Sequence, residues 1–299
     1  MFDIADSSPP DASPTYNDLA EPGGSRSGAQ PAIKHGDAMT RGSRMSEELL
    51  KEFREGVLWL TIHRPERRNA LNEPVVRGLL ETLSDANKNR EIRAIVLTGS
   101  GEQAFCAGAD LQAGGSFVFD YSEPYLGYAN LLRCARACTV PLIARVNGAC
   151  MAGGMGLLAV CDIAVAASHA KFGLPEVKVG VFPMQVLSVL QHLVPRRVLT
   201  QMCLTGEPMD APAALAAGLV NVVTDALDEG VEKILKPILS NSPTAIRRGL
   251  YTMKRLEAMP FEEAIAFTEG QIGLLALTED AREGTRAFAE KRPPKWTGK

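Results

Sequence analysis

Hydrophobic and polar positions follow no regular pattern over the first 44 residues, and a regular pattern begins only after them. Residues 1–44 are rich in Pro, Gly and Ser and carry no apolar stripe. Such a segment buries too little apolar surface to offset the entropy that it loses on ordering. We therefore predict a disordered tail over 1–44, and the run MSEELLKEF from Met45 predicts the first helix or strand.

From Gly56 onward, strand patterns and helix patterns alternate. GVLWLTIHRP, RAIVLTG, PLIARVNG and DIAVAA are typical of strands, whereas EPVVRGLLETLSDANKN, residues 122–138 and MAGGMGLLAVC are typical of helices. In the first helical run, Val75, Leu79, Leu80 and Leu83 have the spacing of one helix face. This alternation predicts an α/β fold in which helices cover the strands.

After Gly218 the character of the pattern changes, and three later segments have helical spacing. SPTAIRRGLYTMKRL, FEEAIAFTEGQIGLLAL and EDAREGTRAFAEKR each predict a helix, and Ser242-Pro243 is a start signal for the first of them. We thus divide the ordered chain into an α/β core over 45–240 and a helical region over 241–299. Several apolar positions of these helices exceed what one core can cover: Leu250, Met253, Phe261, Phe267, Ile272 and Leu275. The helical region is therefore expected to form the contacts of an oligomer.

Composition removes several classes of function. The chain has 299 residues and a formal net charge of −3, which argues against a general nucleic-acid binder. It has no apolar run long enough for a membrane span and no signal-peptide pattern, so we expect a cytoplasmic protein with no membrane partner. The six cysteines form no CxxC pair and the four histidines have no ligand spacing, so we expect reduced core thiols and no metal site.

Two segments crowd small residues at a strand-to-helix junction, namely GEQAFCAGADL (101–111) and NGACMAGGMGL (147–157). Glycine and alanine there let a ligand approach the backbone, whose free amides then point at it. The second segment is no P-loop, because Gly154 and Met155 stand where Lys and Ser or Thr are required. It also lacks GxGxxG, so a nucleotide cofactor is not expected. Cysteines border both loops, but no neighbouring His is available to activate a thiolate.

These segments belong to an ordered set that resembles the signature of the enoyl-CoA hydratase/isomerase (crotonase-like) family. The set comprises RPERRNALN (64–72), AFCAGADL (104–111), RVNGACMAGGMGL (145–157), CDIAVA (161–166), AKFGLPEVKVG (170–180), LTGEPMDAPAALAAGLVNVV (204–223) and EGTRAFAEKRPPKWTGK (283–299). The resemblance covers residues 50–299. It implies a spiral of repeated ββα units, followed by a helical region that packs trimers, often paired into hexamers.

The resemblance also implies an acyl-CoA or enoyl-CoA substrate and no separate cofactor, since coenzyme A is part of the substrate. The thioester oxygen would lie between the backbone amides of Ala109 and Gly153, each donor contributing ~3–4 kcal/mol to an enolate-like anion. Glu176 would be the general acid/base. Further substrate contacts would come from Arg68, Ala70, Ala107, Gly108, Asp110, Leu111, Gly154 and Pro175.

Some of these positions have a second interpretation. The side chains of Asp110 and Asp162 fit a structural role that ties loops to the core. Arg67 and Arg68 have the geometry to bind the phosphates of coenzyme A, although a solvated surface pair fits them equally well. The aromatic segment GSFVFDYSEPYLGY (115–128) is expected to line the acyl pocket, and simple packing would also explain it.

One position departs from the family's pattern. Hydratases of the family commonly use two glutamates, of which Glu176 is the second, and the first falls on Gly156. Hydration is our leading hypothesis, with Glu176 either moving both protons in sequence or sharing the task with another residue of the pocket. A double-bond isomerase that needs one base, a thioester hydrolase and a non-catalytic acyl-CoA-binding scaffold are the alternatives. An ionised carboxylate beside an apolar pocket is costly, so Glu176 argues against the scaffold.

Overall fold

The computed structural model describes residues 48–110, 122 and 124–299, all of which belong to the unit Arg44–Lys299. The predicted tail over 1–44 lies outside the described residues. The same holds for Leu111 and for most of the aromatic segment over 115–128. The fold below is that of the described part of the chain.

The larger sheet has six strands in the order β1-β2-β3-β5-β7-β10. Their bounds are β1 Leu49–Arg54, β2 Val57–Ile62, β3 Ala94–Gly99, β5 Leu142–Val146, β7 Ile163–Ala167 and β10 Val222–Thr224. Only β1 runs antiparallel to its neighbour, because the β1–β2 connection is a tight hairpin in which Glu55 and Gly56 both have positive φ. The four strand patterns predicted from the sequence are β2, β3, β5 and β7, and all four are confirmed.

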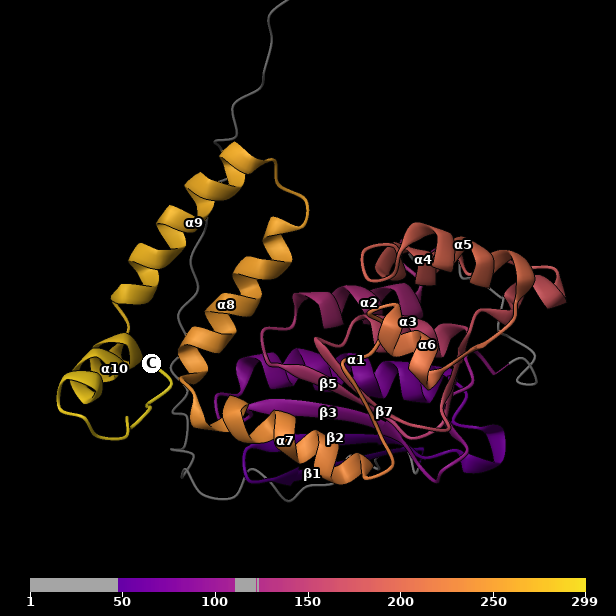
Figure 1. The fold of residues 1–299 in the computed structure, drawn as a ribbon, viewed down its shortest axis with the longest axis horizontal. Helices are drawn as coiled ribbons and strands as arrows, with labels where there is room; N and C mark the ends of the chain where they lie inside the picture. The colour runs from indigo at the N-terminus through magenta and orange to yellow at the C-terminus, as the bar shows by residue number, and fades with distance from the viewer. Residues whose placement is uncertain (1–47, 111–121, 123) are drawn as a thin grey trace, which may run out of the picture. The chain divides into compact units, whose positions relative to one another are not determined.

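Side chains alternate between the two faces of this sheet, and each face is buried. On β2, Leu58, Leu60 and Ile62 join the main core, while Val57 joins a second cluster on the opposite face. Helix α7 (Leu227–Ser240) covers the second cluster, and α1 (Glu73–Lys88) and α2 (Gly127–Ala137) lie on the main-core face (Figure 1). The predicted α/β class is therefore confirmed.

A second, smaller sheet was not predicted from the patterns. It consists of β4 Ala104–Cys106, β6 Ala149–Met151, β8 Lys171–Gly173 and β9 Met209–Asp210, in that order. Strands β4, β6 and β8 are parallel to one another, and β9 is antiparallel to β8. Each has only two or three residues, which is too short for an alternation to show in the sequence.

Short helices connect the strands of the two sheets. They are η1 Pro65–Arg67, α3 Gly153–Ala159, η3 Pro175–Val179, α4 Met184–Leu190, α5 Arg196–Thr205 and α6 Ala211–Ala216. Helix α3 packs on α4, and α5 packs on η3. Lys178 of η3 is paired with Glu207 just after α5 at 2.7 Å, which holds the two elements together.

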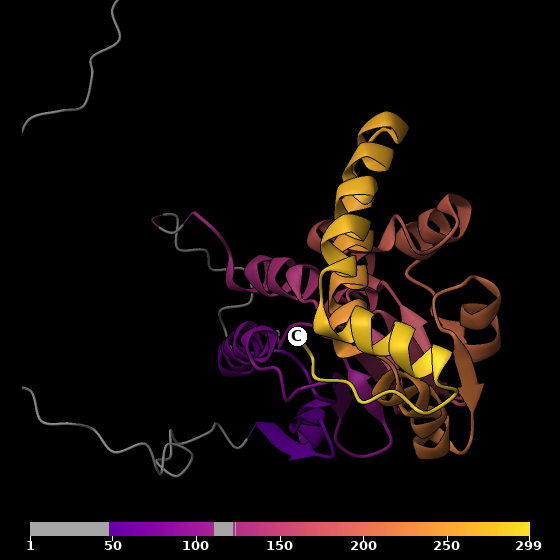
Figure 2. The same cartoon turned by 90° about the vertical axis from the view of Figure 1, so that its left-hand side faces the viewer.

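The three predicted C-terminal helices are present as α8 Pro243–Leu256, α9 Phe261–Ala276 and α10 Glu279–Ala289. The hydroxyl of Ser242 caps α8 by accepting from the amide of Ala245 at 3.0 Å, as the start signal predicts. Helices α8 and α9 form a hairpin that extends past the end of the sheet (Figure 1), and in the turned view α9 stands in front of α8 (Figure 2). We call this pair the C-terminal arm. In the described part of the chain, no helix is long and apolar enough to span a membrane.

Candidate active site

Three parallel strands of the smaller sheet end at the same edge, and a predicted site residue follows each of them. Ala109 comes after β4, Gly153 after β6 and Glu176 after β8. Because β4, β6 and β8 are neighbours in the sheet, their carboxyl ends lie side by side. Parallel sheets in general present ligand sites at this edge. The fold thus brings together the three residues that the sequence predicts as catalytic.

The amide of Ala109 is turned toward the site by its pairing with Leu71. Leu71 donates to the carbonyl of Gly108 at 2.7 Å and accepts from the amide of Asp110 at 2.9 Å. Alternation along a strand then points the N–H of Ala109 away from Leu71. Among the described residues, no acceptor is found for this N–H, so it is available to a ligand.

The amide of Gly153 is presented by a strained turn. Ala152 has φ 50° and ψ −122°, a conformation that an L-residue rarely adopts, and its N–H is tied to the carbonyl of Gly173 at 2.9 Å. Gly153 is the first residue of α3, so its N–H has no partner within the helix. Backbone strain of this kind is typical of functional sites.

The segment that carries Ala109 and the segment that carries Gly153 are in contact, and each contains a glycine where they meet. Gly108 has φ +97°, and a Cβ there would lie 2.6 Å from Cβ of Ala152 and 3.2 Å from the nitrogen of Gly153. A Cβ on Gly154 would lie 2.3 Å from the carbonyl oxygen of Cys106. Only glycine permits this approach, so the predicted contact residues Gly108 and Gly154 first serve to set the distance between the two loops.

Glu176 carries the one ionisable side chain among the three predicted catalytic residues. It is the second residue of η3. Its Oε2 atom is buried and has no hydrogen-bond partner among the described residues. Burial raises the pKa of its carboxyl above the ordinary value of 4.5, and its own backbone amide partly opposes that shift. A buried oxygen that lacks a protein partner is what a proton-transfer group awaiting substrate or water requires.

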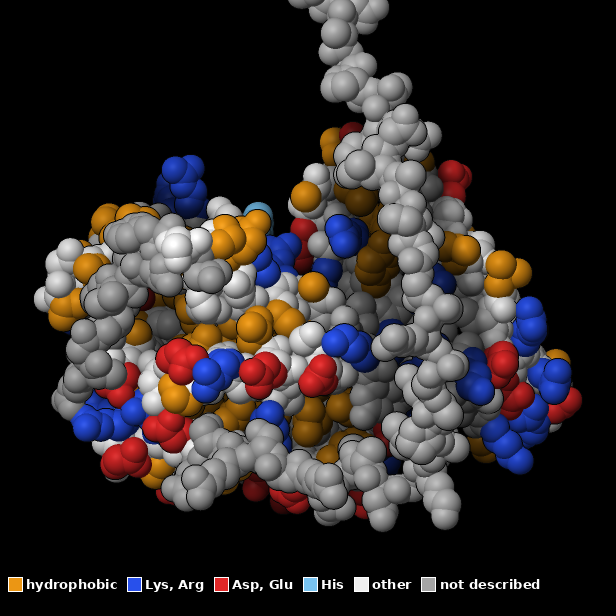
Figure 3. Space-filling view, turned by 180° about the vertical axis from the view of Figure 1, so that it is seen from behind, with side chains coloured by type: hydrophobic (Ala, Val, Ile, Leu, Met, Phe, Trp, Pro, Cys, Tyr) orange, Lys and Arg blue, Asp and Glu red, His pale blue; other side chains and the backbone are white. Residues whose placement is uncertain are grey.

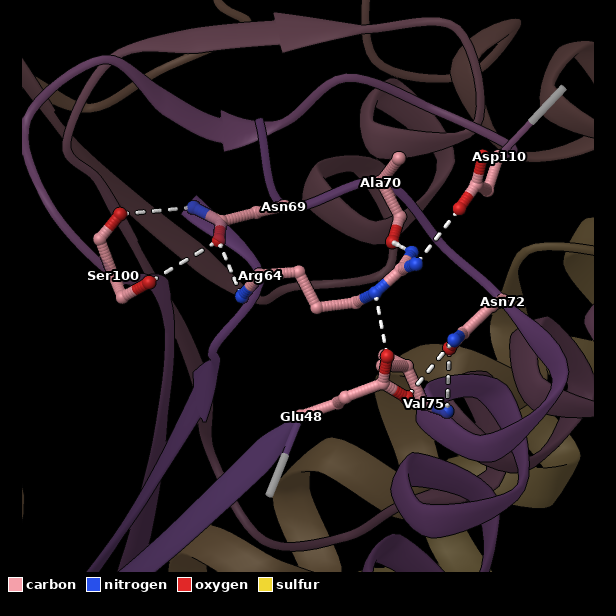
Figure 4. A network of polar contacts seen from close by, with 8 residues as sticks. All are labelled: Glu48, Arg64, Asn69, Ala70, Asn72, Val75, Ser100 and Asp110. Atoms are coloured by element: carbon pink, nitrogen blue, oxygen red, sulfur yellow. Dashed lines mark hydrogen bonds and ion pairs between the residues drawn. The ribbon is translucent and has the colours of Figure 1, made fainter. Parts of the chain in front are cut away.

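A buried arginine holds the loop that carries Ala109 (Figure 4). Arg64 donates to Glu48 Oε1 at 2.9 Å, to the carbonyl of Ala70 at 2.6 Å and to Asp110 Oδ2 at 2.7 Å. Its own amide donates to the side chain of Asn69 at 3.0 Å. Asp110 is next to Ala109, so this ion pair fixes the position of the amide.

The network supports the structural interpretation of Asp110, whose carboxylate is engaged by Arg64. Asp162 is likewise tied down, since it pairs with Lys254 at 2.9 Å and accepts from the amide of Leu142 at 2.8 Å. Arg64 and Asn69 were not singled out from the sequence. Both stand in the RPERRNALN segment, and their burial, which no sequence pattern showed, reveals their structural role.

The other predicted contact residues border this region. Arg68 is exposed, has a left-handed backbone, and lies beside an open hollow lined also by Glu102, Gln103, Ala149 and His169. The carbonyl of Arg68 accepts from the amide of Ala107 at 3.1 Å, which joins the two loops. Ala70 is buried, Pro175 begins η3, and Leu111 lies outside the described residues.

The cysteines next to the loops are buried thiols. Cys106 is fully buried, and burial raises the pKa of its thiol to about 12. The pKa of Cys150 is raised well above its usual value for the same reason. Neither thiol is a nucleophile at neutral pH. Over the described ranges, no three His, Cys, Asp or Glu side chains are grouped as a metal site.

Known proteins resemble this chain over most of its length. The family model described as enoyl-CoA hydratase/isomerase matches residues 52–299. The chain is 37% identical over 258 residues to an enoyl-CoA hydratase of Mycobacterium tuberculosis, covering 83% of this chain and 95% of the relative. It is 32% identical to the (E)-benzylidenesuccinyl-CoA hydratase of Thauera aromatica, covering 83% of this chain and 98% of the relative.

Solved structures share the fold. An enoyl-CoA hydratase of Mycobacterium smegmatis has a TM-score of 0.76 at 32% identity, covering 83% of this chain and 98% of that one. One from Bacillus anthracis has a TM-score of 0.78 at 26% identity, covering 85% and 100%. The crotonase-like spiral implied by the sequence resemblance is therefore confirmed. With a family model over 52–299 and relatives above 30% identity matched along nearly their whole length, this chain belongs to the enoyl-CoA hydratase/isomerase family.

Proposed function

We propose that this protein adds water to a 2-enoyl-CoA, with Glu176 moving the protons and the amides of Ala109 and Gly153 holding the thioester oxygen. The observation that carries the proposal is the buried, unpartnered Oε2 of Glu176 at the strand edge from which the two amides also project. Two amide donors and one carboxylate are the groups that an enolate-forming reaction requires.

One carboxylate is enough to account for every proton transfer in this reaction. The Glu176 carboxylate takes a proton from water, and the water oxygen forms a bond to C3 of the enoyl group. The electron pair of the C2–C3 double bond becomes a C1–C2 double bond, and the π pair of the thioester carbonyl moves onto its oxygen. Ala109 and Gly153 donate hydrogen bonds to this enolate oxygen, and the carbonyl re-forms when C2 is protonated. Protonated Glu176 then returns its proton to C2, which regenerates the carboxylate.

The raised pKa of Glu176 supports this double role. A group that both removes and returns a proton works best when its pKa lies near the working pH. An ordinary glutamate is too weak a base for that task, and burial shifts the pKa of Glu176 in the required direction. The same burial supports turnover rather than simple binding, because the fold keeps an acid in an unfavourable environment.

The predicted contact residues fall into two groups in this proposal. Gly108, Gly154, Ala70, Ala107 and Pro175 shape the backbone around the thioester. Arg68 is an exposed cation whose carbonyl accepts from the amide of Ala107, and we assign to its guanidinium the phosphates of coenzyme A.

Double-bond isomerisation is the alternative that a specific observation favours. Gly156 supplies no second carboxylate, and an isomerase needs only one group to move a proton between C2 and C4. The test is a screen of purified protein against 2-enoyl-CoA and 3-enoyl-CoA series of increasing chain length. Conversion of the 2-enoyl series to 3-hydroxyacyl-CoA supports hydration. Turnover of the 3-enoyl series alone would replace it by isomerisation, and binding without turnover would favour the scaffold.

We also propose that the protein assembles as a trimer or hexamer through the C-terminal arm. Helix α9 has no buried residue, although it carries exposed apolar side chains such as Phe261, Ile272 and Leu274. Hydrophobic side chains are visible on this arm from behind (Figure 3). Large apolar surfaces of this kind are rare on monomers.

A further inference from the structure

A tyrosine from a neighbouring helix fills the space beside Gly156. Tyr128 is the second residue of α2, and α2 contributes it to the region of α3 and α4. A Cβ built on Gly156 would lie only 2.1 Å from the hydroxyl oxygen of Tyr128 and 3.4 Å from Cγ2 of Val186. The phenol of Tyr128 and any side chain at position 156 therefore exclude one another.

The hydroxyl is held in place by the backbone of the site. Tyr128 donates its O–H to the carbonyl of Gly153 at 2.5 Å. Its ring carbon Cζ lies 3.7 Å from where a Cβ on Gly153 would stand. The phenol thus lies along α3 between Gly153, whose amide holds the thioester oxygen in our proposal, and Gly156, where other hydratases of the family carry a carboxylate.

The phenol stays neutral at the working pH. Burial raises the pKa of Tyr128 well above 10, and the nearby groups Cys106, Cys150 and Glu176 raise it further. Tyr128 is therefore no general base. Its proton is committed to Gly153, while its oxygen keeps lone pairs that accept hydrogen bonds.

We propose that Tyr128 is the second polar group of the active site, its phenol oxygen accepting a hydrogen bond from the water that Glu176 deprotonates. This inference rests on the function proposed above. The water donates one hydrogen to Tyr128 and the other to Glu176, which leaves its oxygen free to bond to C3. Tyr128 neither gains nor loses a proton, so the balance of the reaction is unchanged.

The proposal separates two reactions of the same site. Hydration needs a positioned water and hence Tyr128. Exchange of the C2 hydrogens of a saturated acyl-CoA needs only Glu176 to remove a proton and the two amides to hold the enolate. A tyrosine that merely supported the backbone of Gly153 would affect both reactions, because both depend on the Gly153 amide.

The test is Tyr128→Phe, which keeps the ring and removes the hydroxyl. Hydration is measured with the wild type's best 2-enoyl-CoA, and C2 exchange is measured with butyryl-CoA in D₂O by NMR. We expect kcat for hydration to fall by about 10- to 100-fold, the loss of one hydrogen bond to a reacting group. The rate of C2 exchange should stay within about threefold of wild type, since its barrier then changes by under about 0.7 kcal/mol.

Tyr251→Phe is the matched control, because Tyr251 is an exposed tyrosine of α8, outside the site, whose ring contacts Arg255 and Phe267. It should leave both rates unchanged.

Gly156→Ala is the second variant, since its Cβ displaces the hydroxyl of Tyr128 without removing it. It should lower hydration selectively, and it should add little to the loss caused by Tyr128→Phe, because the two changes remove the same interaction.

Each other outcome has a definite meaning. Hydration by Tyr128→Phe at the wild-type rate would overturn the role of Tyr128, and so would a parallel loss of hydration and exchange. A wild-type protein that exchanges C2 hydrogens but hydrates no enoyl-CoA would overturn it as well, while leaving Glu176 as the acid/base. If Glu176→Gln retains both reactions, the proposed function itself is wrong.

Discussion

At the scale of single residues, Glu176 combines a buried oxygen with the absence of a protein partner among the described residues. Glu176→Gln keeps the size of the side chain and most of its hydrogen bonding but removes proton transfer. We expect kcat to fall by about 100-fold or more while acyl-CoA affinity changes little. Steady-state kinetics and a binding titration measure the two quantities. A loss below about tenfold would assign the proton transfer to another group.

The pH dependence of the reaction follows from the same carboxyl. The base form of Glu176 is lost as the pH falls through its pKa in the free enzyme, and that pKa lies above 4.5. We therefore expect the acidic limb of kcat/KM to fall at a pH higher than that of an ordinary glutamate. The measurement is a pH profile of wild type between pH 4 and 9, with Tyr251→Phe as a control in which the acidic limb stays at the wild-type pH.

Ionisation of Glu176 as the pH rises has opposite effects on activity, which it increases, and on stability, which it decreases. Because the pKa of Glu176 is raised in the folded state, the folded protein binds more protons than the unfolded chain between the two pKa values. The free energy of unfolding therefore decreases as the pH rises through that window. Thermal melts at neutral pH should show Glu176→Gln at least as stable as wild type. A clear loss of Tm would mean that the carboxylate has a stabilising partner.

At the scale of elements, Arg64 joins the residue just before β1 to the loop that carries Ala109. Its guanidinium pairs with Glu48 and with Asp110, and its own side chain is buried. Arg64→Met would leave the Asp110 carboxylate buried without its cation, at a cost of about 3–5 kcal/mol. We expect Tm to fall by roughly 10 °C and kcat to fall as well, because the Ala109 amide loses its support.

The matched control for this change is an ion pair elsewhere on the molecule. Asp228 pairs with Arg145 at 2.7 Å, and its side chain is 74% exposed. Asp228→Asn should cost under about 1 kcal/mol, as exposed pairs usually do. Equal Tm values for Arg64→Met and Asp228→Asn would show that the Arg64 network does not hold the loop.

The elements also show why part of the site escaped prediction. Helix α1 follows from the helical spacing of its apolar residues, and β3 follows from its continuous run of buried residues. The strands β4, β6 and β8 have three residues each inside Gly-rich segments, so periodicity cannot reveal them. The family resemblance supplied Ala109, Gly153 and Glu176 instead. The place of Tyr128 depends on how α2 packs beside α3, a contact that no local pattern encodes.

At the scale of the whole molecule, the unburied apolar face of α9 decides the expected assembly. Among its residues Phe261 is 75% exposed and Ile272 is 64% exposed, although α9 packs along α8. We expect sedimentation at micromolar concentration to give a trimer or hexamer of the 32.1 kDa chain, because burying these side chains removes apolar surface from water.

Ile272→Asp should shift the protein toward smaller species by placing a charge in the interface. Glu263→Gln, an exposed polar change on the same helix, should leave the assembly intact. A 32.1 kDa wild-type species at that concentration would contradict the proposal. An Ile272→Asp protein that sediments as wild type would place the interface elsewhere on the chain.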